Sequence, residues 1–525
     1  MTYKAFDEFA GWGGSSQGLH AIPGLDVVLA ANHKPIAVEV HKMNFPATQH
    51  YRGDIRDAEI EKFVRADFFW ASPACPGWTD ARGVKREFDK QTTTLFDDDE
   101  LGKKKDTSEA ARSRVLMEEV PRYLRAMAER GEPVLVGAVE NVVQVRKWAE
   151  WKRWLNEIRN MDYHVHVIAL NAMHVWGPVT GRVPQSRNRA FVGYSHKKLG
   201  RTPDWDKWLR PSAYCPTCDQ VVKAIQVFKN PNNNMGVYGV RHGQYVYRCP
   251  NVTCRNQIIE PGVIPAVAAI DWSLPPGNTI GERAAGIGRR LKPATIARAR
   301  AGYEKYWRPL LTPAGGTWRD EAAPLDVPMA ARTTRDNDML LVPPLMVPCT
   351  GREGKHAQPG DRPLPTQTCR QDMAVMLAPF IAELRGGGSR EKARSVTDPL
   401  STISANGNHH ALVGAGQARW QDILMPYYGN GTCRPVDEPL GTLSTRDRFA
   451  LLGLTGLAAF EDCTVRMLTP PEVGAGCAFA PDYKVTGTGR EQVAGYGNAV
   501  PPPMAEVIGS PLMEALTGEE LEPAW

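Results

Sequence analysis

The alternation of short apolar runs with amphipathic stretches between Tyr3 and Tyr194 constrains the fold of this chain more than any other feature. Six of the runs have the length and composition of buried strands, and helical segments lie between several of them. The runs are KAFDEFA, VVLAA, DFFWASP, VLVGAVE, HVHVIAL and AFVGY. Strands and helices in this order predict an α/β domain around a doubly wound parallel sheet.

The size and composition set outer limits on the architecture. A chain of 525 residues can bury more than one core, so we expect two or three domains. The net charge of +5 permits nucleic-acid binding without indicating it. No run of about 18 apolar residues occurs and the N-terminus has no signal pattern, so we expect no membrane span and a cytoplasmic location. The 10 cysteines are then expected to be thiols, metal ligands or catalytic groups.

A Pro-Leu dipeptide recurs at intervals of about 40 residues in the second half of the chain. The copies begin at Pro324, Pro363, Pro399 and Pro439, and polar residues and then a short apolar run follow each one. These apolar runs are MLLV, MAVML, HALV and FALL. The period predicts a small β-rich unit used several times, and a purely structural array is the alternative.

Two close pairs of cysteines occur in the segment 199–262, which is rich in Cys, Asn and Tyr. Cys215 and Cys218 form the first pair, and Cys249 and Cys254 form the second. Two such pairs with a Pro turn in each predict a zinc ribbon with four thiolate ligands, and unliganded thiols are the alternative. We expect a structural zinc ion rather than a catalytic one, because no His or water-activating Glu belongs to the motif.

The segment FDEFAGWGG follows the first predicted strand and precedes a helix. Glycines at such a turn let backbone N–H groups approach a cofactor closely. When the segment is taken alone, an ordinary glycine turn is the default interpretation.

Three further motifs lie at predicted strand ends, where α/β folds place their ligands. Cys75 lies in the Pro- and Gly-framed turn SPACPG, although a single Cys is more often a buried small hydrophobe. Glu140 of ENV follows the apolar run VLVGAV, so its carboxyl group is expected at the same sheet edge. Arg187 and Arg189 of QSRNR precede a strand, and their alternation places them on one face.

Together with RMLTPPE and GNAVPPP near the C-terminus, these motifs resemble the DNA cytosine-C5 methyltransferase family over roughly residues 5–195 and 463–510. The resemblance implies a Rossmann-like, S-adenosylmethionine-dependent methyltransferase domain that methylates carbon 5 of cytosine in double-stranded DNA. The family inserts its DNA-recognition region between the QxRxR motif and the two late motifs. The β-rich repeats therefore correspond to a target-recognition region.

The resemblance also implies roles for the catalytic residues. Cys75 attacks carbon 6 of a flipped-out cytosine, Glu140 supports nitrogen 3, and Arg187 with Arg189 contacts the base and steadies Cys75. The long segment 76–110, which has no periodicity in most of its length, takes the place of the loop that closes over the base.

The family's cofactor contacts carry over to a set of residues near the glycine turn and two other motifs. These residues are Phe9, Gly11, Gly13, Gly14, Asp54 and Asn498. Three departures from the family pattern affect this prediction. Ala74 replaces the usual Pro before the nucleophile, Asn32-His33 replaces an acidic residue that holds the ribose, and GAGCAFA replaces the stretch that usually follows RMLTPPE. The second departure leaves room for a modified cofactor.

Four segments follow from these assignments: a catalytic domain (1–198), a zinc-ribbon insertion (199–262), a target-recognition region (263–460) and a segment that completes the catalytic domain (461–525). We expect a monomer that binds double-stranded DNA, with a cognate restriction endonuclease as a candidate partner. Further candidate DNA contacts, each with a solvated surface residue as the alternative, are Arg298, Arg300, Lys305, Arg434, Arg446 and Arg448. Two rival functions stay open: an RNA cytosine methyltransferase of the same fold, and an inactive or altered-cofactor DNA-binding homologue.

Overall fold

The structure is a computed structural model, and the chain divides into two compact units. The first unit is Met1–Ile264 with Val473–Trp525, and the second is Pro265–Glu472. The described residues are 2–73, 109–264, most of 266–290, the strands between 310 and 467, and 469–524. Cys75 and residues 76–108 therefore lie outside the described residues, as do Arg298, Arg300, Lys305, Arg446 and Arg448.

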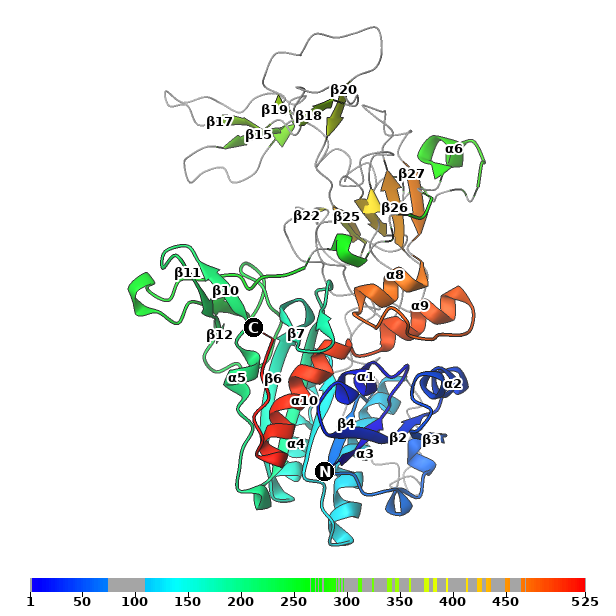
Figure 1. Cartoon of the computed structure of the whole chain (residues 1–525), viewed down its shortest axis with the longest axis vertical. Coiled ribbons are helices and arrows are strands. Elements are labelled where there is room, and N and C mark those ends of the chain that lie inside the picture. Colours follow the sequence, from blue (N-terminus) through cyan, green and yellow to red (C-terminus); the bar gives the residue numbers. More distant parts are fainter. Residues whose placement is uncertain are drawn as a thin grey trace, which may run out of the picture. The chain divides into compact units, whose positions relative to one another are not determined.

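A seven-stranded sheet in the order β3-β2-β1-β4-β5-β9-β6 forms the centre of the first unit (Figure 1). Strand β9 is antiparallel to β5 and β6, whereas the other pairs are parallel. This is the doubly wound order 3-2-1-4-5-6 with one strand inserted. The strands are β1 (Tyr3–Glu8), β2 (Leu25–Asn32), β3 (Gln49–Arg52), β4 (Phe68–Ala71), β5 (Val136–Asn141), β6 (Tyr163–Asn171) and β9 (Asn188–His196).

The six strands predicted from apolar runs are confirmed as β1, β2, β4, β5, β6 and β9. Strand β3 was not predicted, because its residues QHYR are half-buried or exposed at the sheet edge and form no apolar run. The antiparallel direction of β9 was not predicted either, since a buried strand has the same composition in either direction.

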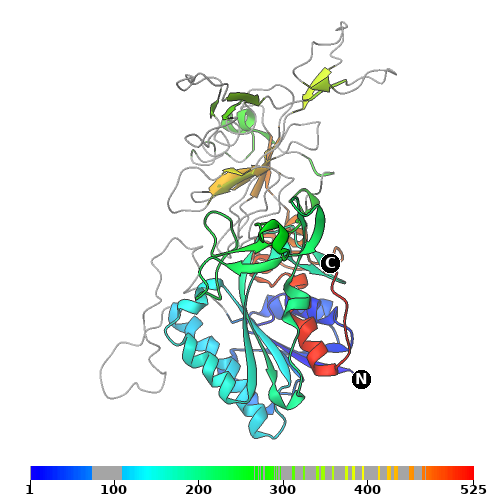
Figure 2. The ribbon, with the colours of Figure 1, turned by 90° about the vertical axis from the view of Figure 1, so that its left-hand side faces the viewer.

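Neighbouring residues of the central strands enter two different cores, one on each face of the sheet. Ala5 and Phe68 belong to one core, whereas Phe6 and Phe69 belong to the other. Figure 2 shows helices on both sides of the sheet. They are α1 (Gly14–His20), α5 (Trp205–Leu209) and α10 (Pro502–Thr517) in the first core, and α3 (Glu109–Glu129) and α4 (Trp151–Asn160) in the second.

The remaining short elements of this unit connect the strands or extend their ends. The helices are α2 (Pro35–Asn44) and α9 (Gly489–Asn498), and α8 (Pro470–Gly476) precedes α9. The short 3-10 turns and strands are η1 (Ile55–Asp57), η2 (Ile60–Lys62), η4 (Val143–Lys147), η5 (Ala172–His174), β7 (Trp176–Gly177), β8 (Gly181–Arg182) and η6 (Lys197–Leu199).

The C-terminal helix α10 is an integral part of the first unit. A carbon atom added at Gly18 of α1 would lie 2.2 Å from the carbonyl oxygen of Pro502, so the two helices are in direct contact. The buried carboxylate of Glu506 accepts hydrogen bonds from the backbone N–H groups of Val179 (2.8 Å) and Thr180 (2.9 Å). After the second unit, the chain thus returns to the first unit and completes it.

Two hairpins carry the cysteine pairs on the second core of the first unit. Strand β10 (Ser212–Cys215) pairs with β11 (Gln220–Lys223), and β12 (Ile225–Phe228) pairs with β13 (Tyr245–Arg248). The turn η7 (Val252–Cys254) follows. The buried residues of these hairpins, among them Tyr245 and Tyr247, form one continuous core with α3 and α4.

The second unit consists mainly of short strands. The apolar runs expected after each Pro-Leu dipeptide lie on β17, β20, β23 and β26, and two three-stranded sheets, β16-β15-β17 and β19-β18-β20, have the same order. Its elements are η8 (Ala266–Ala269), β14 (Asn278–Thr279), α6 (Ile280–Ala284), β15 (Leu310–Pro313), β16 (Ala323–Pro324), β17 (Asp338–Leu341), β18 (Leu345–Pro348), β19 (Gln358–Pro359), β20 (Met373–Met376), β21 (Ile381–Leu384), β22 (Ala393–Arg394), β23 (Leu412–Val413), β24 (Ile423–Pro426), β25 (Gly431–Pro435, which includes Arg434), β26 (Phe449–Gly453) and β27 (Thr464–Met467). Among the described residues of both units, no helix has the length and apolar character needed to cross a membrane.

The contact between α1 and α10 gives a first prediction. Gly18→Ala should lower the free energy of unfolding by about 1–3 kcal/mol, because its methyl group has no room beside Pro502. Gly262→Ala is the matched control, since the nearest atom to its added carbon would be 3.6 Å away. Urea denaturation of both variants measures the difference, and equal losses would contradict the tight packing of α10.

Candidate active site

The turn between β1 and α1 has an unusual backbone. Phe9, Gly11 and Gly13 all lie in the left-handed region, with φ angles of 62°, 56° and 80°. Phe9 is the informative residue, because a side chain in this region costs about 1–2 kcal/mol. The turn lies where β1 and β4 are neighbours and the strand order reverses, the place where open α/β sheets bind ligands. Among the described residues, an added carbon at Gly11 would meet only the Phe9 carbonyl oxygen, at 3.8 Å, so these residues leave the Gly11 backbone accessible.

The late GNAVPPP segment lies between this turn and the QSRNR segment. An added carbon at Gly14 would be 2.0 Å from the carbonyl oxygen of Val500. The carbonyl oxygen of Gly497 accepts a hydrogen bond from Arg187 Nη1 at 3.3 Å. Asn498, the last residue of α9, is exposed and lies in the sequence between Gly497 and Val500, which make these two contacts. The structure therefore brings together three of the motifs predicted to form one site.

Glu140 and Arg189 form a buried ion pair. Arg189 Nε lies 2.7 Å from Glu140 Oε1, and the two side chains are 9% and 10% exposed. Arg187, on the other side of Asn188, is also buried, and its backbone N–H donates to Asn171 Oδ1 at 3.0 Å. The predicted acid and both predicted arginines thus occupy one largely dry region, where charges interact strongly.

The chain that leads into Cys75 is anchored beside Glu140. Asn141, the next residue after Glu140, donates from Nδ2 to the carbonyl oxygen of Pro73 at 3.2 Å. The backbone N–H of Ser72 donates to the carbonyl oxygen of Glu8 at 3.1 Å. Pro73 precedes Cys75 by two residues. The last described residues before the predicted nucleophile therefore contact β5, the strand of Glu140, through Pro73 and β1 through Ser72.

Cys477, from the GAGCAFA stretch, is a thiol near the two arginines. It is fully buried, and burial raises its pKa to about 12. Its sulfur lies 3.9 Å from Gln185 Nε2 and 3.6 Å from the carbonyl oxygen of Tyr496. A thiol with such a pKa stays protonated at neutral pH, so this cysteine packs rather than reacts.

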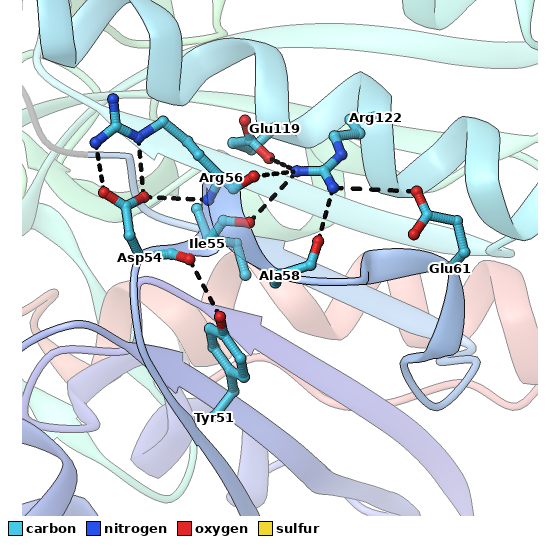
Figure 3. A network of polar contacts seen from close by, with 8 residues as sticks. All are labelled: Tyr51, Asp54, Ile55, Arg56, Ala58, Glu61, Glu119 and Arg122. Carbon is cyan, nitrogen blue, oxygen red and sulfur yellow. Dashed lines mark hydrogen bonds and ion pairs between the residues drawn. The ribbon is translucent and has the colours of Figure 1, made fainter.

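Asp54, a predicted cofactor contact, is held rigidly at the end of β3. Its Oδ1 accepts from the backbone N–H of Arg56 at 3.1 Å and from Arg56 Nε at 2.9 Å (Figure 3). These bonds lower the pKa of Asp54, so its carboxylate is charged at neutral pH. Gly53 N–H donates to the carbonyl oxygen of Asn32 at 3.3 Å, which joins the ends of β2 and β3.

An arginine that no motif indicated holds the turn η1, which follows Asp54. Arg122 of α3 donates to the carbonyl oxygens of Ala58 (2.7 Å) and Ile55 (3.4 Å), and it pairs with Glu119 at 2.9 Å (Figure 3). Arg122 was not predicted, because one basic residue on an amphipathic helix is normally a solvated side chain. Arg122 therefore connects α3 to the turn that follows Asp54.

Asn32 stands where the family has an acidic residue. Its Oδ1 accepts a hydrogen bond from the backbone N–H of Lys34 at 2.9 Å, which stabilises the turn after β2. His33 is exposed, and desolvation lowers its pKa despite the nearby charge of Asp54. This part of the site therefore presents an amide and an imidazole in place of a carboxylate.

Two buried acidic residues at the end of β1 were not predicted. Asp7 Oδ2 accepts hydrogen bonds from the hydroxyl groups of Ser15 (2.6 Å) and Ser16 (2.7 Å), and burial raises its pKa to about 7. Glu8 is also fully buried, and within the described residues neither carboxyl oxygen has a hydrogen-bond partner. Burial and the neighbouring Glu119 raise the pKa of Glu8 well above its usual range.

The four cysteines of the two hairpins and the turn that follows them form one cluster. The sulfur atoms of Cys215, Cys218, Cys249 and Cys254 all lie within 4.8 Å of one another, and Cys218 Sγ is 4.0 Å from Cys249 Sγ. Four thiolates at about 2.3 Å from a tetrahedral zinc ion are about 3.8 Å apart. This cluster could therefore hold a metal ion with little rearrangement.

Comparison with known proteins identifies relatives of the first part of the chain. Residues 3–234 match the family model of the C-5 cytosine-specific DNA methylases, so the resemblance predicted from the motifs is confirmed for this range. The chain is also 26% identical over 204 residues to the Type II methyltransferase M1.ScrFI of Lactococcus lactis subsp. cremoris. That match covers 39% of this chain and 44% of the relative, so it spans less than half of each protein.

Solved structures of methyltransferases resemble the chain only loosely. A DNMT2 variant of Spodoptera frugiperda has 11% identity and a TM-score of 0.45, and the match covers 98% of this chain and 100% of the other. The methyltransferase EhMeth of Entamoeba histolytica has 9% identity and a TM-score of 0.43, with 98% and 99% covered. With TM-scores below 0.5, these similarities do not bear on the substrate.

The raised pKa of Asp7 predicts a pH dependence of stability. An acid whose pKa rises on folding contributes stability below its unfolded pKa of 3.8, and this contribution is lost as the pH rises through about 7. The loss amounts to roughly 4 kcal/mol, and Asp7→Asn should abolish it. Urea denaturation between about pH 4 and pH 8 should thus show the variant gaining on the natural protein as pH rises. Parallel curves for the two proteins would contradict the raised pKa.

Proposed function

Because residues 3–234 belong to the C-5 cytosine-specific DNA methylase family, we propose that the chain transfers a methyl group from S-adenosylmethionine to carbon 5 of cytosine in double-stranded DNA. The observation that most supports this proposal is the buried ion pair of Glu140 and Arg189. The pair lies next to Asn141, which binds the carbonyl oxygen of Pro73, and Pro73 precedes Cys75 by two residues in the sequence.

The proposed reaction begins with covalent addition. The Cys75 thiolate forms a bond to carbon 6 of the cytosine, and the electron pair of the ring double bond moves to carbon 5. Glu140 holds nitrogen 3 of the base and so stabilises the electron-rich adduct. After methylation of carbon 5, a base removes the proton from that carbon, the double bond re-forms, and the carbon–sulfur bond breaks to release Cys75.

Arg189 and Arg187 support this chemistry in different ways. Arg189 fixes the orientation of the Glu140 carboxylate through the 2.7 Å ion pair. Arg187 is anchored on the Gly497 carbonyl, so its charge stays near the base and the thiolate. Because carbon 5 and carbon 6 are out of reach inside a stacked duplex, the base is flipped out.

The residues present fit S-adenosylmethionine, whose positively charged sulfur supplies a methyl group without its electron pair. The left-handed turn at Phe9, Gly11 and Gly13 exposes backbone at the sheet's switch point, and Gly14 lets Val500 approach. Asp54 is charged, exposed in part and fixed by Arg56, as a contact to the adenine requires. Asn498 is exposed and lies in the sequence between Gly497, which binds Arg187, and Val500, which contacts Gly14. Asn32 takes the place of the acidic residue that binds the ribose in the family.

Other parts of the chain have supporting roles in this proposal. The four cysteines bind one structural zinc ion, which suits the separation of their sulfur atoms. The β-rich second unit, Pro265–Glu472, is the target-recognition region. Similarity to a Type II methyltransferase supports a role in restriction and modification, with a cognate endonuclease as partner. We further propose that the protein acts as a monomer in the cytoplasm.

A duplex with 5-fluorocytosine at the target position tests the function, because fluorine at carbon 5 prevents release of the enzyme. Bisulfite sequencing of DNA from cells that express the chain first gives the target site. With S-adenosylmethionine, the natural protein should form a covalent complex stable to denaturation, and Cys75→Ala should form none. Cys477→Ala is the control, since this buried thiol should not be needed for trapping. Trapping by Cys75→Ala to the same extent would overturn the assignment.

The same trap separates the rival functions. Trapping only on RNA with 5-fluorocytosine would identify an RNA cytosine methyltransferase. Binding of DNA without trapping or methylation would identify an inactive homologue, to which the departures at Ala74 and His33 point.

The hydrogen bonds from Arg122 to Ile55 and Ala58 give a prediction about cofactor binding. Arg122→Met should weaken S-adenosylmethionine binding about tenfold, because η1 and the neighbouring Asp54 lose their support from α3. Arg125→Met on the same helix is the control, since Arg125 is 51% exposed and pairs only with Glu157 among the described residues. Isothermal titration calorimetry measures the affinities, with circular dichroism as the check on folding. Equal affinities of the two variants would contradict a role of Arg122 in supporting the cofactor site.

A further inference from the structure

We propose that the cysteine-bearing hairpins, residues 210–262, act as a positioning module for the Glu140–Arg189 pair through Asn188. The inference rests on the proposed function, since it assigns a metal-dependent role within the same site. The hairpin module and this site belong to the same compact unit. The alternative for such a module is a separate surface that contacts nucleic acid.

The module is attached to the sheet by specific bonds as well as by packing. Gln226 Nε2 donates to the carbonyl oxygen of Ala169 at 2.7 Å, and Asn233 contacts Arg146. Buried Tyr245 and Tyr247 belong to the same core as α3 and α4. A movement of the module would therefore disturb the sheet.

The decisive contact lies at the start of β9. Asn188 Oδ1 accepts hydrogen bonds from the backbone N–H of Tyr238 (2.9 Å) and from Asn171 Nδ2 (3.1 Å). Tyr238 comes from the module, and Asn171 ends β6. The side chain of Asn188 is thus bound on one side by the module and on the other by the sheet.

Asn188 passes this constraint to the active site. Its carbonyl oxygen accepts a hydrogen bond from Arg189 Nη1 at 2.9 Å, while Arg189 Nε contacts Glu140 at 2.7 Å. The guanidinium group therefore has one fixed contact on Asn188 and one on the carboxylate. A shift of Asn188 would rotate the guanidinium and with it the acid that holds the base.

The cysteine cluster controls the segment that contains Tyr238. The ring of His174 is buried and contacts the rings of both Tyr238 and Tyr247, with centroid distances of 4.4 and 5.0 Å and near-perpendicular planes. The two tyrosine rings also contact each other, with centroids 5.9 Å apart. Tyr247 precedes Cys249 by two residues on β13, and Tyr238 forms a β-bridge to Tyr245 on the same strand. A metal ion at Cys249 thus fixes β13, and β13 fixes Tyr238.

A metal ion is the natural stabiliser of such a module, because small segments with little core of their own depend on a metal or disulfides. Without the metal, the sulfur atoms have no shared ligand, and β13 is held by its pairing with β12 and by its core contacts alone. The Tyr238 N–H bond to Asn188 would then weaken, and Arg189 would lose part of its fixed geometry.

Two variants and a metal measurement test the proposal. Asn188→Ala should lower kcat about 10- to 100-fold, as expected for misplacement of a catalytic group, with the KM for DNA and the zinc content unchanged. Asn188→Asp keeps the acceptor oxygen and should recover part of kcat. Cys249→Ser should lose zinc and show the same kcat defect. Val221→Thr is the module's control, since Val221 is 69% exposed.

The double variant gives the sharpest result. If the module acts through Asn188, Cys249→Ser combined with Asn188→Ala should be no slower than the worse single variant, because both remove the same constraint. Additive losses would overturn the proposal. A rise in the KM for DNA with unchanged kcat on zinc loss would also overturn it and would identify a nucleic-acid contact instead.

A measurement without catalysis separates this inference from the proposed function. Hydrogen exchange of the backbone at the start of β9 should become faster when a chelator removes zinc from the natural protein, and also in Asn188→Ala. Unchanged exchange there after zinc removal would reject the inference. Absence of any methyl transfer by the natural protein would reject the proposed function, while the exchange result would still decide the coupling. The chelator also replaces Cys249→Ser if that variant does not fold.

Discussion

The ion pair between Arg189 and Glu140 is the interaction on which the candidate site depends. Both side chains are about nine-tenths buried, so each charge has lost most of its water and is stabilised mainly by the other. Removing one partner from such a pair typically costs about 3–5 kcal/mol, because the other is left buried and uncompensated. The surrounding contacts support this pair: the carbonyl oxygen of Asn188 accepts a hydrogen bond from Arg189, and Asn141 joins the strand that carries Glu140 to Pro73.

The sheet order explains how residues so distant in the sequence meet. Inserting β9 between β5 and β6 in the antiparallel direction places the start of β9 beside the end of β5. In this register Glu140 is opposite Phe191 and Asn141 is opposite Ala190. A motif that follows one strand and a motif that precedes another therefore share one edge of the sheet. A parallel β9 would have placed the arginines at the opposite edge.

Sequence patterns predicted the parts of this arrangement that are local. The six predicted strands contain apolar runs, the alternation of Arg187 and Arg189 places both at one strand start, and the cysteine spacing indicated a cluster. The direction of β9 and the contacts of Arg122 and Asn188 depend on residues far away in the chain, which leave no periodicity in the sequence. Cys75 lies outside the described residues, so its role stays a prediction, as do the roles of Glu140 and the arginines.

The long insertion between the two parts of the first unit adds little to the entropic cost of bringing these parts together. A chain of this kind can therefore contain a large second unit. The entropy of closing a loop grows only with the logarithm of its length, and each doubling adds about 0.6 kcal/mol. The C-terminal segment must offset that cost with local contacts, and α10 has them. Glu506 binds Val179 and Thr180, which precede it by more than 300 positions, and Glu514 accepts from Lys207 Nζ at 2.7 Å. The first unit can thus keep its site while the second changes in length and sequence, provided that the contacts of α10 persist.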